Sequence, residues 1–135
     1  MHNAKLTSPP RARLTFRVGV VGHRLNRLST DPQALDRLRT AVRGVLSATR
    51  QAVLAFSNED SRKAAARRLY SDAPALLRAI SPLAEGTDRI FADEASKLSF
   101  ELCCPLPFHR DEFVRDFTTP GEPHELNSVA NFGRL

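Results

Sequence analysis

The chain has 135 residues, of which 41% are hydrophobic and 26% charged, with no Trp, which indicates one globular domain and excludes wholesale disorder. No run approaches the roughly 18 consecutive apolar residues that a membrane-spanning helix requires. Residues 1–13 contain no apolar stretch typical of a secretory signal, so we expect a cytoplasmic protein without a membrane partner.

Positive charge is concentrated at the start of the chain. Residues 1–50 hold 10 Lys and Arg against two Asp, a net charge of +8, whereas residues 51–135 hold 10 basic and 13 acidic residues, a net charge of −3. A basic surface attracts nucleotide phosphates and polyanions, so binding to nucleic acid is one hypothesis. No aromatic ladder interleaves the arginines, as single-strand binding would favour. The alternative is an ordinary solvated helix face.

The first predicted elements are an arm, a strand and a long helix. Residues 1–13 are polar and contain Pro9-Pro10, which predicts a disordered arm. Residues 14–21 are rich in β-formers and predict a buried strand that ends at Gly22. Asp31-Pro32 is typical of a helix start, and apolar residues then recur at helical spacing as far as Phe56, over about six turns.

A polar connector, residues 57–73, separates this helix from the next strand and includes a short helix-prone stretch at 64–70. Further along the chain, the pattern predicts a strand at 76–81, a helix after 84–89, a strand at 100–106 and a short helix at 110–117. In the middle helix Asp93 and Lys97 are spaced for an ion pair. Residues 118–135 carry no clear pattern and are expected to form an irregular tail.

Strands that alternate with helices predict an α/β fold with a parallel sheet. We expect a Rossmann-like three-layer sandwich over residues 14–117, incomplete because it holds only about three βα units. A three-stranded sheet leaves edges unpaired, which suggests a homo-oligomer formed through an exposed sheet edge. Cys103 and Cys104 are adjacent and are expected to be two free thiols in a buried strand.

The carboxyl ends of parallel strands share one rim, where ligands of such folds bind. Three predicted loops bring basic groups, carboxylates and flexible glycines to this rim, and helix N-termini there favour anions. The candidate ligand- or phosphate-binding residues are Gly22, His23, Arg24, Glu85, Gly86, Thr87, Asp88, Arg89, His109 and Arg110.

Several of these residues also have purely structural interpretations. Gly22 could simply permit a turn, Asp88 could cap a helix, and Arg89 could pair with a nearby carboxylate. The sequence lacks a P-loop, a complete dinucleotide fingerprint, a zinc-protease helix motif and a nucleophile elbow. A kinase, a dehydrogenase or a serine hydrolase is therefore not expected, and neither a metal nor a cofactor is indicated.

Three blocks of the chain resemble the SLOG superfamily, the Rossmann-like group that includes the Smf/DprA and LOG proteins. They are residues 17–24, with Gly-His-Arg, residues 81–89, with Ala-Glu-Gly-Thr-Asp-Arg, and residues 106–113, with Leu-Pro-Phe-His-Arg-Asp-Glu-Phe. The resemblance covers about residues 14–117 and implies nucleotide-binding sensors or phosphoribohydrolases. Thr87 stands where such members usually carry a small Ala, and the later Gly/Thr-rich phosphate loop has no counterpart here.

Three functions therefore remain as hypotheses. The first is the binding or sensing of a nucleotide or nucleotide-derived ligand, without catalysis. The second is hydrolysis of a nucleotide N-glycosidic bond, in which Glu85 or Asp88 would act on water. The third is an inactive, truncated remnant that works by pairing with another subunit.

Overall fold

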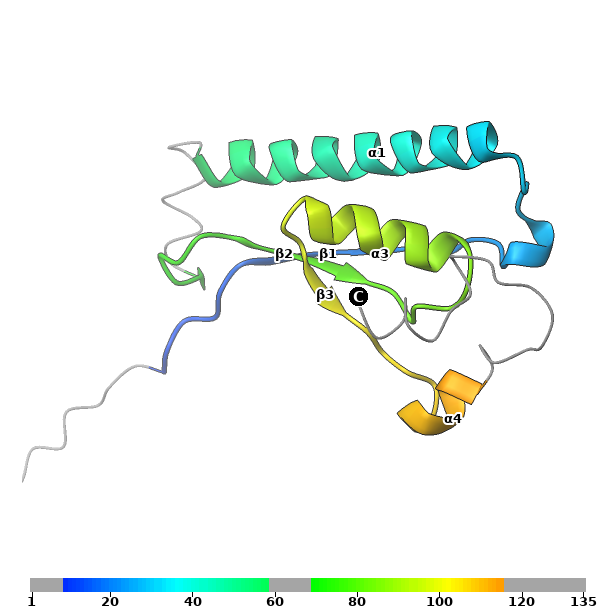
Figure 1. Ribbon diagram of the computed structural model, residues 1–135. Coiled ribbons are helices and arrows are strands. Elements are labelled where there is room, and N and C mark those ends of the chain that lie inside the picture. The colour runs from blue at the N-terminus through cyan, green and yellow to red at the C-terminus, as the bar shows by residue number, and fades with distance from the viewer. Residues whose placement is uncertain (1–8, 59–68, 116–135) are drawn as a thin grey trace, which may run out of the picture.

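The computed structural model describes residues 9–58 and 69–115, which fold into an open α/β unit (Figure 1). In chain order its elements are β1 (Thr15–Gly19), the 3-10 helix η1 (Leu25–Arg27), α1 (Pro32–Asn58), β2 (Leu76–Ile80), α3 (Thr87–Lys97), β3 (Glu101–Cys103) and α4 (Arg110–Arg115). The predictions for residues 1–8, for most of the 57–73 connector and for the 118–135 tail lie outside the described residues.

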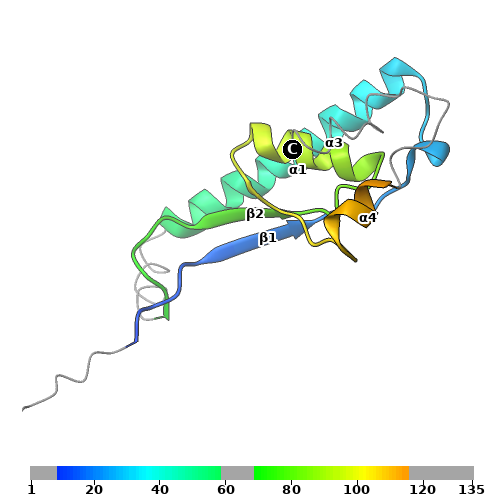
Figure 2. The same cartoon turned by 60° about the horizontal axis from the view of Figure 1, so that its bottom comes forward.

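The three strands form a parallel sheet in the order β1-β2-β3, which confirms the predicted α/β class. Helices α1 and α3 both lie over the same face of this sheet (Figures 1 and 2). The described residues therefore supply two layers of the expected sandwich, consistent with an incomplete Rossmann-like fold. Because the three strands are parallel, their carboxyl ends lie at one rim.

The two faces of the sheet differ in polarity. Val18, Leu77 and Leu102 pack into the core beneath the helices. On the opposite face, the register aligns Arg17 with Arg78 and Arg78 with Glu101. The Arg78 guanidinium donates to the Glu101 carboxylate, with an Nε–Oε1 distance of 3.0 Å. This alternation follows from the two-residue period of a strand.

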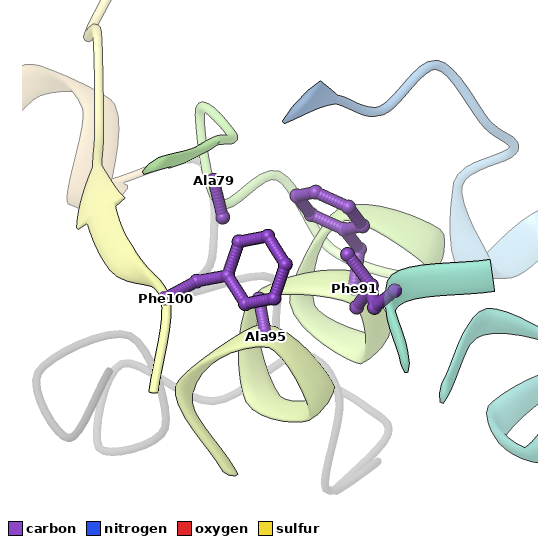
Figure 3. Close-up of a cluster of buried hydrophobic side chains, with 5 residues drawn as sticks. Ala79, Phe91, Ala95 and Phe100 are labelled. Carbon is purple, nitrogen blue, oxygen red and sulfur yellow. The ribbon is translucent and has the colours of Figure 1, made fainter. Parts of the chain in front are cut away.

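The core lies between the sheet and the helices. Figure 3 shows Ala79 of β2, Phe91 and Ala95 of α3, and Phe100 with their side chains directed toward one another. Leu46 of α1 belongs to the same cluster and is 1% exposed. The small alanines let the two phenylalanine rings approach the sheet closely, so α3 is held firmly above β2 and β3.

Helix α1 begins as predicted, at an aspartate cap. The Asp31 carboxylate accepts hydrogen bonds from the backbone N–H groups of Gln33 and Ala34, both at 3.2 Å. The helix extends over 27 residues to Asn58, slightly longer than expected. Among the described residues, no helix is both long enough and apolar enough to span a bilayer.

Ion pairs join α1 to α3. The Arg43 Nε donates to Glu94 Oε2 at 2.6 Å, and the Arg39 Nη1 lies 3.5 Å from Asp93 Oδ2. Lys97 contacts Asp93 at 2.7 Å, which confirms the predicted pair, and reaches Glu94 at 3.0 Å. The side chain of Glu94 is completely buried. Two of the basic residues assigned to a solvated face are thus part of the helix–helix contact.

Burial by itself would raise the pKa of Glu94, but the hydrogen bonds from Arg43 and Lys97 outweigh it, so the pKa is lowered. The buried carboxylate is therefore charged at neutral pH. Its two cationic partners keep part of their surface in water, which limits the total cost of desolvation.

The first and third strands are shorter than predicted. Strand β1 ends at Gly19, and Val21, which was expected in the buried strand, is fully exposed. Strand β3 covers only Glu101–Cys103 and not 100–106. Both limits have one cause: β2 ends at Ile80, whose register partners are Gly19 and Cys103. Residues beyond these positions have no β2 partner.

Smaller differences concern the cysteines and the arm. Cys103 and Cys104 are free and partly buried, but Cys104 lies outside the strand, and burial raises the pKa of its thiol. Ala12 forms a parallel bridge to Tyr70, and Arg13 donates from Nε to the Pro74 carbonyl at 2.6 Å. The last residues of the expected arm therefore contact the segment that precedes β2.

Candidate functional site

The structure brings the loop after β1 against the start of α3. The backbone N–H of Thr87 donates to the His23 carbonyl at 3.1 Å, and the Thr87 hydroxyl donates to the same oxygen at 3.0 Å. Because His23 and Thr87 are 64 positions apart, this contact depends on the parallel arrangement of β1 and β2. Two of the three candidate loops are therefore neighbours at the rim.

Gly22 lies directly beneath this contact. A Cβ atom at Gly22 would lie 2.4 Å from Thr87 Cγ2, 2.5 Å from its Cβ and 2.7 Å from its Oγ1. The absence of a side chain at Gly22 thus allows the two loops to close on each other. This packing accounts for the glycine without a ligand, and a phosphate contact at Gly22 stays a prediction.

Arg24 and Glu85 form the charged pair at the rim. The Arg24 Nη1 donates to Glu85 Oε1 at 3.3 Å. The Arg24 side chain is 66% exposed, whereas that of Glu85 is 16% exposed. An exposed guanidinium can turn toward an anionic ligand without losing much packing, while the carboxylate beside it is mostly buried.

The loop between β2 and α3 is held by Ser81 and Arg89. The Ser81 hydroxyl donates to the Asp88 carbonyl and accepts from the Leu83 N–H, both at 3.2 Å. Leu83 has a φ of 59° and is 4% exposed, and Gly86 has a φ of 94°. Glycine adopts a positive φ without strain, as Gly86 does here. At Leu83, packing has to stabilise this conformation.

Arg89 is 2% exposed and donates from Nε to the Leu83 carbonyl at 3.1 Å. Burial lowers the pKa of its guanidinium and the charge of Glu85 raises it, with burial dominant. The structure therefore gives Arg89 a role in holding the loop, whereas the sequence suggested a phosphate contact or a pair with a nearby carboxylate. Of the two candidate phosphate-binding arginines Arg24 and Arg89, the exposed one is Arg24.

Asp88 lies in the first turn of α3 and is not its cap. Gly86 occupies the N-cap position, and no side chain caps this helix. Burial raises the pKa of Asp88, a hydrogen bond from the Ala84 backbone lowers it, and the Glu85 charge raises it further, so the net pKa is raised. The capping interpretation is wrong. Asp88 is a partly buried carboxyl group near a second carboxylate.

The third candidate loop is attached through apolar contacts. Phe113 of α4 belongs to one buried cluster with Leu83 and Ala92. His109, in contrast, is exposed and makes a local contact: its Nδ1 accepts from the Asp111 N–H at 3.4 Å. Arg110 begins α4 and is exposed. The described contacts thus anchor α4 beside the second loop without joining His109 to Arg24.

Sequence reasoning missed two residues that shape the site. Ser81 is completely buried and joins Leu83 to Asp88. The sequence signal for it was its place directly after an apolar strand and before Pro82. Glu94 joins α3 to α1 through Arg43. Its burial was not predicted, because it lies beside Asp93 and Lys97, a spacing typical of ion pairs on a helix surface. Within the described ranges, no group of three metal-ligating side chains comes together.

Comparison of the chain with protein-family models, with curated proteins and with solved structures finds no match.

Proposed function

We propose that this domain binds a phosphate-bearing nucleotide or nucleotide-derived ligand at the rim formed by residues 22–24 and 85–88. The observation that carries the proposal is the Arg24–Glu85 pair, an exposed cation beside a fixed carboxylate on two interlocked loops. A guanidinium favours phosphate oxygens, and a carboxylate accepts hydrogen bonds from ribose hydroxyls or a base.

The parallel sheet supports this assignment, because ligands of open α/β folds bind at the carboxyl ends of the strands. We further propose that the chain is a SLOG-type domain. Two of the blocks that carry this resemblance, residues 17–24 and 81–89, contain the loops that meet at the rim.

The test compares two arginines of similar surroundings. Arg24 and Arg37 are 66% and 71% exposed, and each lies within 4.0 Å of one carboxylate. Calorimetric titration with a panel of nucleoside mono-, di- and triphosphates should show binding that Arg24→Ala weakens by about tenfold or more, or about 1.4 kcal/mol. Arg37→Ala, which removes the same charge, should stay within about twofold.

The proposal is refuted if no member of the panel binds, or if both variants lose the same affinity. The second outcome would assign binding to net charge instead of to the rim. Melting temperatures of the two variants should match that of the unaltered protein, because both side chains are largely exposed.

The raised pKa of Asp88 beside Glu85 favours a second candidate function, hydrolysis of a nucleotide N-glycosidic bond. A carboxyl group with a raised pKa can act as a general acid while its neighbour activates water. Incubation with nucleoside monophosphates, followed by chromatography for free base, tests this. Base release that Glu85→Gln and Asp88→Asn abolish would establish the enzyme, whereas binding without release supports the sensor.

A further inference from the structure

Strand β1 has one paired edge and one free edge. β2 occupies the first, and within the part of the chain that the structure describes no strand occupies the second. An edge of this length presents unpaired backbone N–H and C=O groups that can pair with another strand. The opposite sheet edge offers less, because β3 has three residues and Pro105 follows shortly after it.

The direction of the free backbone groups follows from the ladder. The Leu14 carbonyl accepts from the Leu76 N–H at 2.9 Å, so Leu14 turns its polar groups toward β2. Backbone groups alternate in direction along a strand. Thr15, Arg17 and Gly19 therefore direct their N–H and C=O groups toward the free edge.

We infer that β1 pairs antiparallel with β1 of a second copy of this chain, in a register centred on Val18. This register places Arg17 opposite the Gly19 of the other copy, and Phe16 opposite its Val20. The apolar pairs lie on the face covered by helices. On the other face, each arginine lies opposite a glycine, so no two arginines face each other directly.

The neighbouring registers are less favourable. A pairing centred on Arg17 would set two arginines directly opposite each other, and like charges in that position destabilise a sheet. A pairing centred on Gly19 would set Phe16 opposite Gly22 of the other copy, which has no side chain to pack against the ring. Of these three registers, the one centred on Val18 is the most favourable.

Helix α1 supports the same antiparallel dimer. Small apolar side chains form an exposed flank on this helix: Ala41, Val45, Ala48 and Ala52. Val45 is 65% exposed. At 100° per residue this flank lies on the side opposite Arg43, which faces α3. It is therefore directed away from the helix that covers β2 and β3.

A two-fold axis perpendicular to the sheet keeps both α1 helices on one face. Leu46 packs in one cluster with Val18 and Leu77, so α1 covers the β1–β2 pair. Two such helices would lie about two strand spacings apart, roughly 10 Å, which is close to the 8–10 Å of packed helices. One operation thus pairs the free edge and covers the exposed α1 flank.

Gly19 allows a charge test that leaves the protomer intact. A Cβ at Gly19 would meet only the Ile80 carbonyl oxygen, at an ordinary distance of 3.8 Å. In the dimer, Gly19→Lys places a cation opposite Arg17 of the other copy, twice, and Gly19→Glu places an anion there. Sedimentation equilibrium on the full chain should give a dimer whose dissociation constant rises at least tenfold in Gly19→Lys.

Gly19→Glu should associate as tightly as the unaltered chain or more tightly, and Arg17→Glu combined with Gly19→Lys should restore the dimer. Ala48→Glu should weaken it through the α1 flank, with circular dichroism unchanged. A monomer at all concentrations, or equal dissociation constants for the Lys and Glu variants, overturns the inference. Because no nucleotide is needed, this result is independent of the proposed ligand site.

Discussion

Gly22 provides a quantitative test of how the two rim loops fit together. In Gly22→Ala the new methyl would lie 2.4–2.7 Å from three atoms of Thr87. Favourable contacts between carbon atoms lie at about 3.5–4.0 Å, so one loop has to move by about 1 Å. Such overpacking costs about 1–3 kcal/mol. For a domain of this size, that lowers the melting temperature by roughly 4–11 °C.

Gly44 supplies the matched control for the same substitution. It lies within α1, and a Cβ there would have no atom within 4 Å. Gly44→Ala should stabilise the protein by about 0.5–1 kcal/mol, because alanine restricts the unfolded chain and favours the helix. The same Gly→Ala substitution should thus lower the melting temperature at position 22 and raise it at position 44.

Thr87 provides the rescue. In the Gly22→Ala background, Thr87→Ala should restore only part of the stability, because the Thr87 Cβ itself lies 2.5 Å from the new methyl. Thr87→Gly removes all three atoms and should relieve the contact. Calorimetry of the single and double variants checks this. An unchanged melting temperature in Gly22→Ala, or no relief from Thr87→Gly, would refute the assigned packing.

Two further predictions concern buried polar groups. Ser81→Ala leaves the Leu83 N–H without its acceptor and should lower the free energy of unfolding by about 1–3 kcal/mol. Urea denaturation measures this change, and a loss below about 0.5 kcal/mol contradicts the prediction. Glu94 has a pKa lowered from 4.5, so its ionisation stabilises the fold above that pH and the contribution is lost as pH falls further. The unaltered protein should therefore lose more stability than Glu94→Gln between pH 6 and 3, and parallel pH profiles would exclude this role.

Local signals in the sequence were sufficient for the elements that depend on local chemistry. The Asp31-Pro32 start of α1 follows from one cap and one proline, and the Asp93–Lys97 pair follows from helical spacing. The parallel sheet and the meeting of two rim loops follow from the alternation of strands and helices. These features require no knowledge of which residues pack against which.

The errors arose where a neighbour decides the outcome. Val20 and Val21 have high β-propensity, but a strand extends only as far as its partner, and β2 stops at Ile80. The burial of Arg89 could not be predicted either, because it depends on the hydrogen bond to the Leu83 carbonyl, which only the folded loop brings about. Propensity describes the residue, whereas strand length and burial depend on contacts distant in sequence.

The ion pairs bear on the choice between a polyanion and a small ligand. The net charge of +8 over residues 1–50 suggested a surface that could attract nucleic acid. In the fold, arginines from this segment meet carboxylates, and these arginines are Arg11, Arg24, Arg37, Arg39 and Arg43. Pairing within the molecule weakens the long-range field that draws polyanions, because each cation is accompanied by an anion.

What distinguishes Arg24 among these pairs is its position. Arg39 and Arg43 contact carboxylates between two helices and stabilise the packing of α1 on α3. Arg24 pairs at the carboxyl-end rim, on a loop whose backbone is fixed by Thr87. In the proposed function, a ligand phosphate replaces Glu85 as its partner, and the core contacts are unchanged. The same residue type therefore serves structure between the helices and is available for recognition at the rim.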